Sequence, residues 1–477
     1  MDINSQEHIN TIAPVVAQAY KLGKEQKYAE AYEILVPHFE AKEIPSFFEE
    51  PCGWAIYRYL KNYEKKLSTL EIRKALAFYL SFASCKSSAL HSCIMMQAVN
   101  LEKKHENDFR FIEFCLMWKL ENLRDEDYKE YKGTLDNGKN IEIQSLAENV
   151  ATRLYKEMKS RHTEEFVDKL LPFFNIVGNR CPKNKFIRMY IAQMYYWKGE
   201  PETAINEYRD ILRTNPEWYI WKHLGDILED KDLRVSMYCK AMTIMGKDDY
   251  IVNLRLGLAG LLMGKDDGQA AYEIAQYMET YKKNGWTKIP GDAYILQNKL
   301  KDVSPSNHSK QFYAENVSNA EEFAYSDIPV IELTFTGIRK NHAGKDRAHL
   351  QDKRKNISLQ VPCTPSLKEA SIGDVFNVRL QQNEIQTKAL TIHPSGKRVK
   401  VPRPRSVLTT TDTGKSKTIC GTISIPPKGD YCFINHEYYV PERIRKEYNL
   451  QAQQVVNAKV KQMPDGRWKV ITIIKDK

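Results

Sequence analysis

The chain has 477 residues, of which 42% are hydrophobic and 11% aromatic, which predicts a soluble globular protein of several domains. No apolar run approaches the roughly 18 residues that cross a bilayer, and residues 1–14 lack the basic and apolar regions of a signal peptide. We therefore expect a cytoplasmic protein without a membrane partner. The nine cysteines form no CxxC motif and the eleven histidines no HExxH motif, so we expect no metal, no cofactor and no enzymatic activity.

The positive charge is concentrated in the last third of the chain. Residues 327–477 contain 27 Lys and Arg against 14 Asp and Glu, a net charge of +13. The remainder carries 44 against 47, or −3, within a total of +10. A surface that attracts phosphate groups is therefore expected in the C-terminal third.

Residues 1–300 have the periodicity of paired amphipathic helices. In residues 185–216 the small Ala192 and Ala204 allow two helices to approach closely, Gly199 suits the turn between them, and Tyr208 fills the adjoining gap. This spacing resembles the tetratricopeptide repeat. A degraded copy follows at 219–245, and a weaker one opens the chain at 17–35.

These pairs predict an α-solenoid of helical hairpins over residues 1–300. Another type of helical-hairpin stack remains an alternative, since the repeat pattern tolerates much substitution. Such stacks present long surfaces to proteins or peptides, so we expect the helical region to bind a protein partner of unknown identity. Residues 301–326 are polar and weakly periodic, and we interpret them as a linker with a closing helix.

The hydrophobic period shortens to two after residue 327. Strand-like segments at 328–338, 355–362, 372–383 and 385–394 predict a first small β-barrel, of OB type, over residues 327–395. The basic segment 339–356 is interpreted as a loop between strands, either merely solvated or facing phosphate.

Residues 396–416 form a basic segment that contains prolines. We interpret it as an extended linker in which Arg403 and Arg405 follow a nucleic-acid backbone.

A second small barrel is predicted over residues 417–477, from three strands, a short helix and two further strands. The stretch Lys428-Gly429-Asp430-Tyr431-Cys432-Phe433-Ile434 resembles the first RNA-binding motif of the cold-shock family, and Tyr438-Tyr439-Val440 resembles the second. The order of a Tyr-rich strand pair and a basic helical segment is similar to the RNA-binding domain of the transcription terminator Rho. The sequence departs from the cold-shock motif at two positions. The inserted Asp430 adds a negative charge beside the expected surface, and Cys432, in place of glycine, crowds that surface slightly.

Strand alternation identifies the side chains on the outside of this barrel. With Cys432 and Ile434 pointing inward, Tyr431 and Phe433 point outward, and Tyr439 lies outward on the next strand. Exposed rings are typical of platforms on which unpaired bases stack. Alternatively, the rings are covered by another part of the chain. Phosphate groups would be met by four basic residues, Lys428, Arg443, Arg445 and Lys446.

The expected fold is therefore a helical-repeat scaffold followed by two OB-like barrels. The function expected from it is that of a nucleic-acid-binding adaptor for single-stranded nucleic acid, with RNA favoured over DNA. The alternative is a pure protein-interaction scaffold, for example in a bacterial defence complex or one associated with transcription or translation, in which the barrels contact only protein.

Overall fold

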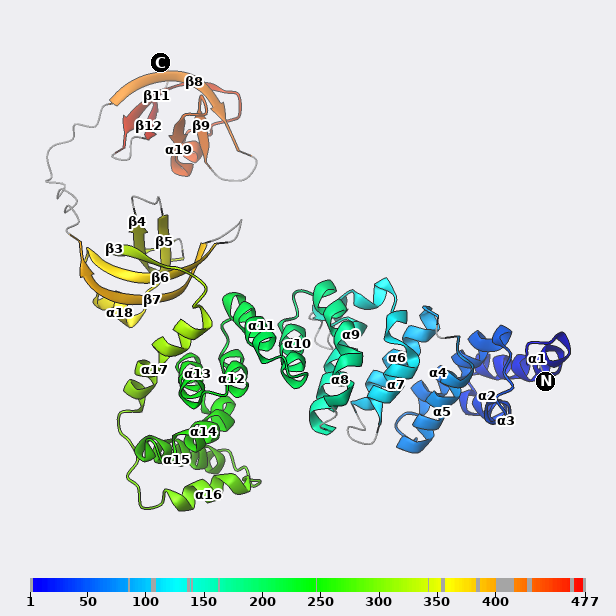
Figure 1. The fold of residues 1–477 in the computed structure, drawn as a ribbon. Helices are drawn as coiled ribbons and strands as arrows, with labels where there is room; N and C mark the ends of the chain where they lie inside the picture. Colours follow the sequence, from blue (N-terminus) through cyan, green and yellow to red (C-terminus); the bar gives the residue numbers. More distant parts are fainter. Residues whose placement is uncertain are drawn as a thin grey trace. The chain divides into compact units, whose positions relative to one another are not determined.

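Helices form the first part of the chain and strands dominate the last part (Figure 1). The computed structural model describes residues 3–84, 86–103, 109–134, 138, 140–161, 164–245, 247–341, 343–352, 357–382, 387–399, 416–426, 431–463 and 467–474. Contacts divide the chain into two compact units. The first contains residues 1–333, 349–362 and 376–395, and the second contains residues 334–348, 363–375 and 396–477.

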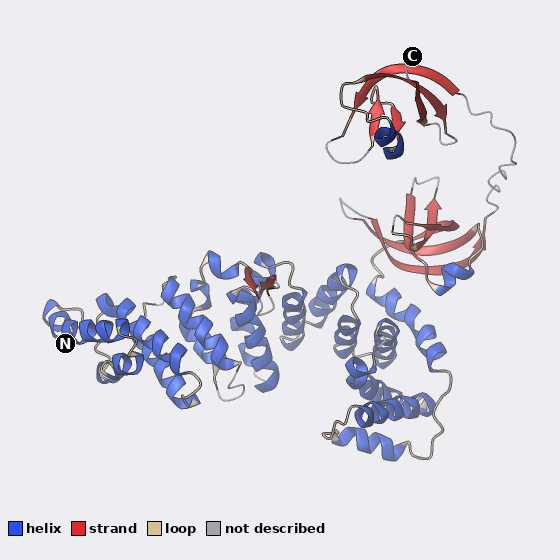
Figure 2. Ribbon diagram, turned by 180° about the vertical axis from the view of Figure 1, so that it is seen from behind, coloured by secondary structure: helices blue, strands red, loops and turns tan. Residues whose placement is uncertain are grey.

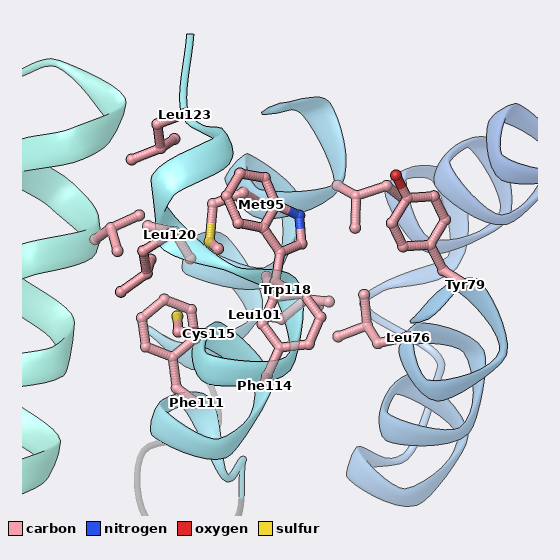
Figure 3. Packing of buried hydrophobic residues seen from close by; sticks show 14 of the residues in the cluster. Leu76, Tyr79, Met95, Leu101, Phe111, Phe114, Cys115, Trp118, Leu120 and Leu123 are labelled. Carbon is pink, nitrogen blue, oxygen red and sulfur yellow. The ribbon is translucent and has the colours of Figure 1, made fainter. Parts of the chain in front are cut away.

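The helices pack mostly against their neighbours in the chain and share two buried apolar clusters. Among the described helices, none has the combined length and hydropathy that a membrane crossing requires. Figure 3 shows part of the first cluster, where Trp118 and Phe114 lie among aliphatic side chains. The helices are α1 Gln6–Lys24, α2 Tyr28–Glu33, α3 Val36–Glu40, α4 Glu49–Tyr63, α5 Thr69–Phe82, α6 Ala89–Glu102, α7 Phe111–Trp118, α8 Leu146–Arg161, α9 Val167–Arg180, α10 Lys185–Trp197, α11 Pro201–Thr214, α12 Trp218–Asp226, α13 Lys231–Ile244, α14 Asp248–Leu262, α15 Asp267–Lys283, α16 Gly291–Lys299 and α17 Ser309–Ala324.

The pair formed by α10 and α11 has the local features that its sequence predicts. Ala192 and Ala204 are fully buried where the helices approach, and Tyr208 is buried beside them. Gly199 adopts a φ of +83° after α10, and the N–H of Glu200 donates to the carbonyl of Tyr195 at 2.9 Å. This hydrogen bond closes the end of the helix in the manner that a left-handed glycine permits.

A short hairpin interrupts the helices (Figure 2). Strands β1 (Tyr131–Thr134) and β2 (Asn140–Ile143) pair antiparallel between α7 and α8. The sequence interpretation did not include this hairpin, because the two strands are only four residues long.

Helix α17 occupies most of the expected linker 301–326 and belongs to the helical core. It packs against α13, and Ala320, Ala324 and the following Tyr325 are buried. The phenol of Tyr325 contacts the Trp221 ring edge to face, with 5.9 Å between ring centroids. The closing helix expected in this segment is therefore present, and small alanines rather than large apolar residues make its contacts with the helical core.

A five-stranded sheet follows, with strand order β5-β4-β3-β6-β7. Its elements are β3 Val330–Lys340, β4 Asp346–Asp352, β5 Ile357–Pro362, α18 Pro365–Glu369, β6 Asp374–Gln382 and β7 Thr387–Arg398. Among the described residues it is an open sheet, which differs from the closed barrel expected for 327–395. The basic segment 339–356 is not a loop throughout, since β4 lies within it and buries Ala348 and Leu350.

Two side chains of this sheet bond to α17 within the first compact unit. Arg379 on β6 is buried and donates to the Glu322 carboxylate of α17 at 2.6 Å. It also donates to the backbone carbonyls of Tyr325, at 2.7 Å, and Ile328, which follow the helix. His393 on β7 contacts the Glu321 carboxylate at 2.5 Å, and Lys240 contacts its other oxygen at 2.5 Å. Burial opposes ionisation of Glu321, but these contacts outweigh it and lower the pKa of the carboxyl group.

The last strands form a closed five-stranded barrel with its own apolar core. The ring order is β10-β12-β11-β8-β9, and β10 runs parallel to β12 whereas the other pairs are antiparallel. Its elements are β8 Ser416–Ser424, β9 Cys432–Ile434, β10 Tyr438–Val440, α19 Glu442–Glu447, β11 Val455–Gln462 and β12 Trp468–Ile474. The predicted order of three strands, a short helix and two strands is confirmed.

Candidate nucleic-acid interface

The hairpin formed by β9 and β10 positions the aromatic residues of the barrel. Asn435 and His436 at its tip have positive φ angles of 55° and 59°, and the N–H of Glu437 donates to the carbonyl of Ile434 at 3.2 Å. Two consecutive left-handed residues are typical of hairpin turns whose twist matches that of the strands. The resulting register places Phe433 directly opposite Tyr439, so both side chains lie on the same face.

Asn435 fixes this hairpin to the neighbouring strand β8. Its backbone N–H donates to the carbonyl of Thr422 at 3.0 Å, and its side-chain Oδ1 accepts from the N–H of Thr422 at 2.9 Å. The side chain lies across Gly421, where an added Cβ would stand 2.4 Å from the amide group. Gly421 is therefore needed for this close approach, and the approach holds the register of β9.

Burial along both strands alternates as strand geometry requires. Cys432, Ile434 and Val440 are completely buried inside the barrel, whereas Phe433 is half-buried and Tyr439 is 39% exposed. This confirms the predicted orientations. Since Cys432 points into the core, where burial raises the pKa of its thiol, it does not crowd the outer face as the sequence comparison suggested.

The three outward rings form one cluster, which we call the aromatic triad: Tyr431, Phe433 and Tyr439. The ring centroid of Tyr431 is 5.8 Å from those of both other rings, and the Phe433 and Tyr439 centroids are 6.0 Å apart. The ring planes meet at 87°, 46° and 65°, so the rings contact one another edge-on or tilted rather than stacked. This mutual contact fixes their positions, while their partial exposure leaves apolar π surface for a planar ligand.

Two lysines extend the triad across the neighbouring strands. Tyr439 is opposite Lys469 in the parallel pair of β10 and β12, and Lys469 is opposite Lys461 in the antiparallel pair of β12 and β11. Lys469 is exposed and Lys461 half-buried. Paired residues share a face, so a row of two rings and two cations crosses the barrel surface. A base on the rings would place its phosphates within reach of such cations.

The sequence did not identify these lysines. Alternation in β12, where Val470 is buried and Lys469 exposed, indicates that Lys469 points outward. The pairing of β10 with β12, however, joins strands that are distant in the chain and parallel, and no local pattern reports it.

The expected basic residues Arg443, Arg445 and Lys446 belong to the short helix α19 and not to the strands of this row. Ile444 and the following Leu450 are buried and anchor the helix to the barrel core. Arg443 and Lys446 are exposed, but Lys446 forms an ion pair with Glu442 one turn earlier. Arg445 is half-buried, and its charge acts on the Cys432 thiol by lowering the pKa that burial raises.

Three further expected contacts, Lys428, Arg403 and Arg405, lie outside the described residues. Across the part of the chain that the structure describes, no group of three or more His, Cys, Asp or Glu side chains could hold a metal ion.

Comparison with known families gives one match. Residues 185–320 match a domain of unknown function, DUF7017. The matched segment runs from the first residue of α10 into α17, so it places most of α17 in one domain with the preceding helices. It does not include the barrel. No curated protein matches the chain.

Proposed function

We propose that the chain is a nucleic-acid-binding adaptor, in which the C-terminal barrel binds single-stranded nucleic acid and the helical region binds a protein. The observation that carries this proposal is the aromatic triad, whose ring centroids lie 5.8–6.0 Å apart on the outside of two adjacent strands. Each base stacked on such rings contributes about 1–3 kcal/mol to binding.

The connectivity of the barrel supports an OB-type fold of the cold-shock or Rho kind. Its third strand is followed by helix α19, and the five strands close in the order β10-β12-β11-β8-β9. OB folds bind oligonucleotides across their second and third strands and the loops beside them. The second and third strands here are β9 and β10, which carry Phe433 and Tyr439.

The net charge of the C-terminal third supports the same assignment. Residues 327–477 carry a net charge of +13. Such a charge attracts a phosphate backbone irrespective of base sequence, and the contacts then release counterions. The RNA preference comes from the resemblance of the two strand motifs to RNA-binding families.

The helical region supplies the adaptor part of the proposal. Its hairpins, of which α10 and α11 have the tetratricopeptide-like spacing, are of the kind that presents an extended surface to another protein. In this proposal the helices bind the protein partner and the barrel binds the nucleic acid.

Fluorescence anisotropy tests nucleic-acid binding. The full chain is titrated into labelled single-stranded RNA, single-stranded DNA and duplex, each of about 12 nucleotides. We expect the single strands to bind more tightly than the duplex, RNA more tightly than DNA, and affinity to fall by about 0.7 log units per log unit of salt for each phosphate contacted. Absence of binding at low salt would leave the protein-only scaffold as the better description.

A further inference from the structure

A groove between α5 and α7 lies in the helical region and is not used by the proposed function. Its volume is about 540 Å³. Buried Leu76 and Phe114 form its floor, and Figure 3 shows these two side chains between the helices that carry them. This volume lies within the range of pockets that bind ligands.

Apolar side chains on both walls of this groove are exposed. Leu70 on α5 is 74% exposed and Met117 on α7 is 58% exposed. Along α5, Leu70, Ala77 and Leu80 follow one another at helical spacing beside the stripe that enters the core, against which Leu80 also packs. Exposed apolar residues that line one groove, rather than being scattered, indicate a binding surface.

The charges around the groove are mainly positive. The carboxylate of Glu113 is held by both terminal nitrogens of Arg161, at 2.9 and 3.1 Å, and this contact lowers the pKa of Glu113. Arg161 also pairs with Glu157, so it compensates the negative charge of Glu113 in part. Arg73 and Arg110 add two exposed guanidinium groups that line the groove, so a negatively charged ligand is favoured there.

We propose that this groove binds an amphipathic helix with acidic residues from a protein partner. A third helix fits between two neighbouring ones by packing its side-chain ridges into their groove, with apolar residues at positions i, i+4 and i+7 facing the floor. Glutamate or aspartate at the edges of that helix would pair with Arg73 and Arg110. The inference specifies the partner in the proposed function, but it does not depend on nucleic-acid binding by the barrel.

Peptide display tests this proposal. A library of random peptides of about 16 residues, or four helical turns, is selected for binding to the full chain. Enriched peptides are then measured by fluorescence polarisation against the wild type and the Leu70→Glu, Met117→Glu and Arg73→Glu variants. Ile295→Glu is the matched control, since Ile295 is 53% exposed on α16, which does not line the groove. Because the two apolar wall residues are largely exposed, their substitution leaves the core intact, and the thermal midpoint verifies this.

We expect enrichment of acidic peptides with apolar residues at helical spacing. Binding of these peptides should weaken about tenfold or more in the Leu70→Glu and Met117→Glu variants, weaken less in Arg73→Glu, and stay unchanged in Ile295→Glu. Oligonucleotide affinity should be the same in all four variants, which separates this proposal from that for the barrel.

The proposal would be overturned if no peptides were enriched, or if the enriched peptides lacked acidic residues. It would also be overturned if the wall variants bound the peptides as tightly as the wild type, or if those variants lost oligonucleotide affinity. Light scattering gives a further check, because a dimer that Met117→Glu converts to a monomer would show that the groove holds a second copy of the chain.

Discussion

The five-stranded sheet and the closed barrel are built from the same succession of elements but present different outer surfaces. Each has three strands, a short helix and two further strands. In the sheet, the outward positions of β4 and β5 carry polar residues such as His349 and Gln360, beside buried Leu350 and Leu359. In the barrel, the second and third strands carry Phe433 and Tyr439 at outward positions.

This difference shows that the order of elements does not determine the ligand. Both regions fill their inward-facing positions with apolar residues, so the core requirement is the same. The outward positions are free of that requirement, and among the described residues of the two regions it is the barrel that uses them for clustered rings. The sheet instead bonds to Glu322 and Glu321 of α17 through Arg379 and His393. Function therefore follows the surface side chains rather than the topology.

The largest expected effect comes from truncating each core. Ile434→Ala and Leu350→Ala remove fully buried side chains, one in the barrel and one in the sheet, and each should lower the free energy of unfolding of its region by about 2–5 kcal/mol. Hydrogen exchange resolves the two regions. Only Ile434→Ala should also abolish oligonucleotide binding, and abolition by Leu350→Ala would mean that the sheet is part of the interface.

A second effect should come from the contact between β8 and the hairpin. Gly421→Ala forces the Asn435 side chain to move and should destabilise the barrel by about 1–3 kcal/mol, as overpacking does. Asn435→Gly removes the obstructing side chain, and glycine tolerates the positive φ at this position. The double variant should therefore be more stable than the sum of the two single changes in the free energy of unfolding predicts. Strict additivity in denaturant unfolding would argue against the proposed clash.

Phe433→Ala addresses the contrast between the two surfaces directly. We expect a loss of about 1–3 kcal/mol in oligonucleotide binding, with little change in unfolding, because the ring is outside the barrel core. Gln360→Ala on β5 is the matched control and should leave binding unchanged. If Phe433→Ala unfolds the barrel, the ring is structural and the stacking surface is wrong.

The smallest expected effect distinguishes two lysines of the barrel. Lys469→Ala should reduce the salt slope of single-strand binding by about 0.7, the value for one phosphate contact. Lys446→Ala should change it less, since Lys446 is already ion-paired with Glu442. The reverse order in salt titrations would favour the helix α19 over the strand row as the path of the backbone.

The sequence predicted those parts of the fold that local patterns encode. Period-two alternation predicted the orientations of Cys432, Phe433 and Ile434, and the small residues of α10 and α11 predicted their close packing. Strand β4 was missed because Ala348 and Leu350 are its only apolar residues and charged residues surround them.

The remaining errors have non-local causes. The closing helix α17 was expected, but its place in the helical core was not, because it contributes small residues such as Ala320 and Ala324, which produce little hydropathy signal along the chain. Lys469 was missed because its neighbour Tyr439 is about thirty positions away and is reached only through the parallel pair β10 and β12. The closure of the barrel, and hence the row of rings and lysines, depends on this pair.

The packing of α17 on α13 has a consequence for how the chain can be shortened. Tyr325 covers Trp221, which is fully buried, and α17 lies over the adjoining helix. A fragment ending at residue 300 would leave that apolar surface bare, as a helical stack without its terminal cap does. The fragment would then self-associate through this surface. The shortest helical fragment that stays monomeric at high concentration must therefore include residues 309–325.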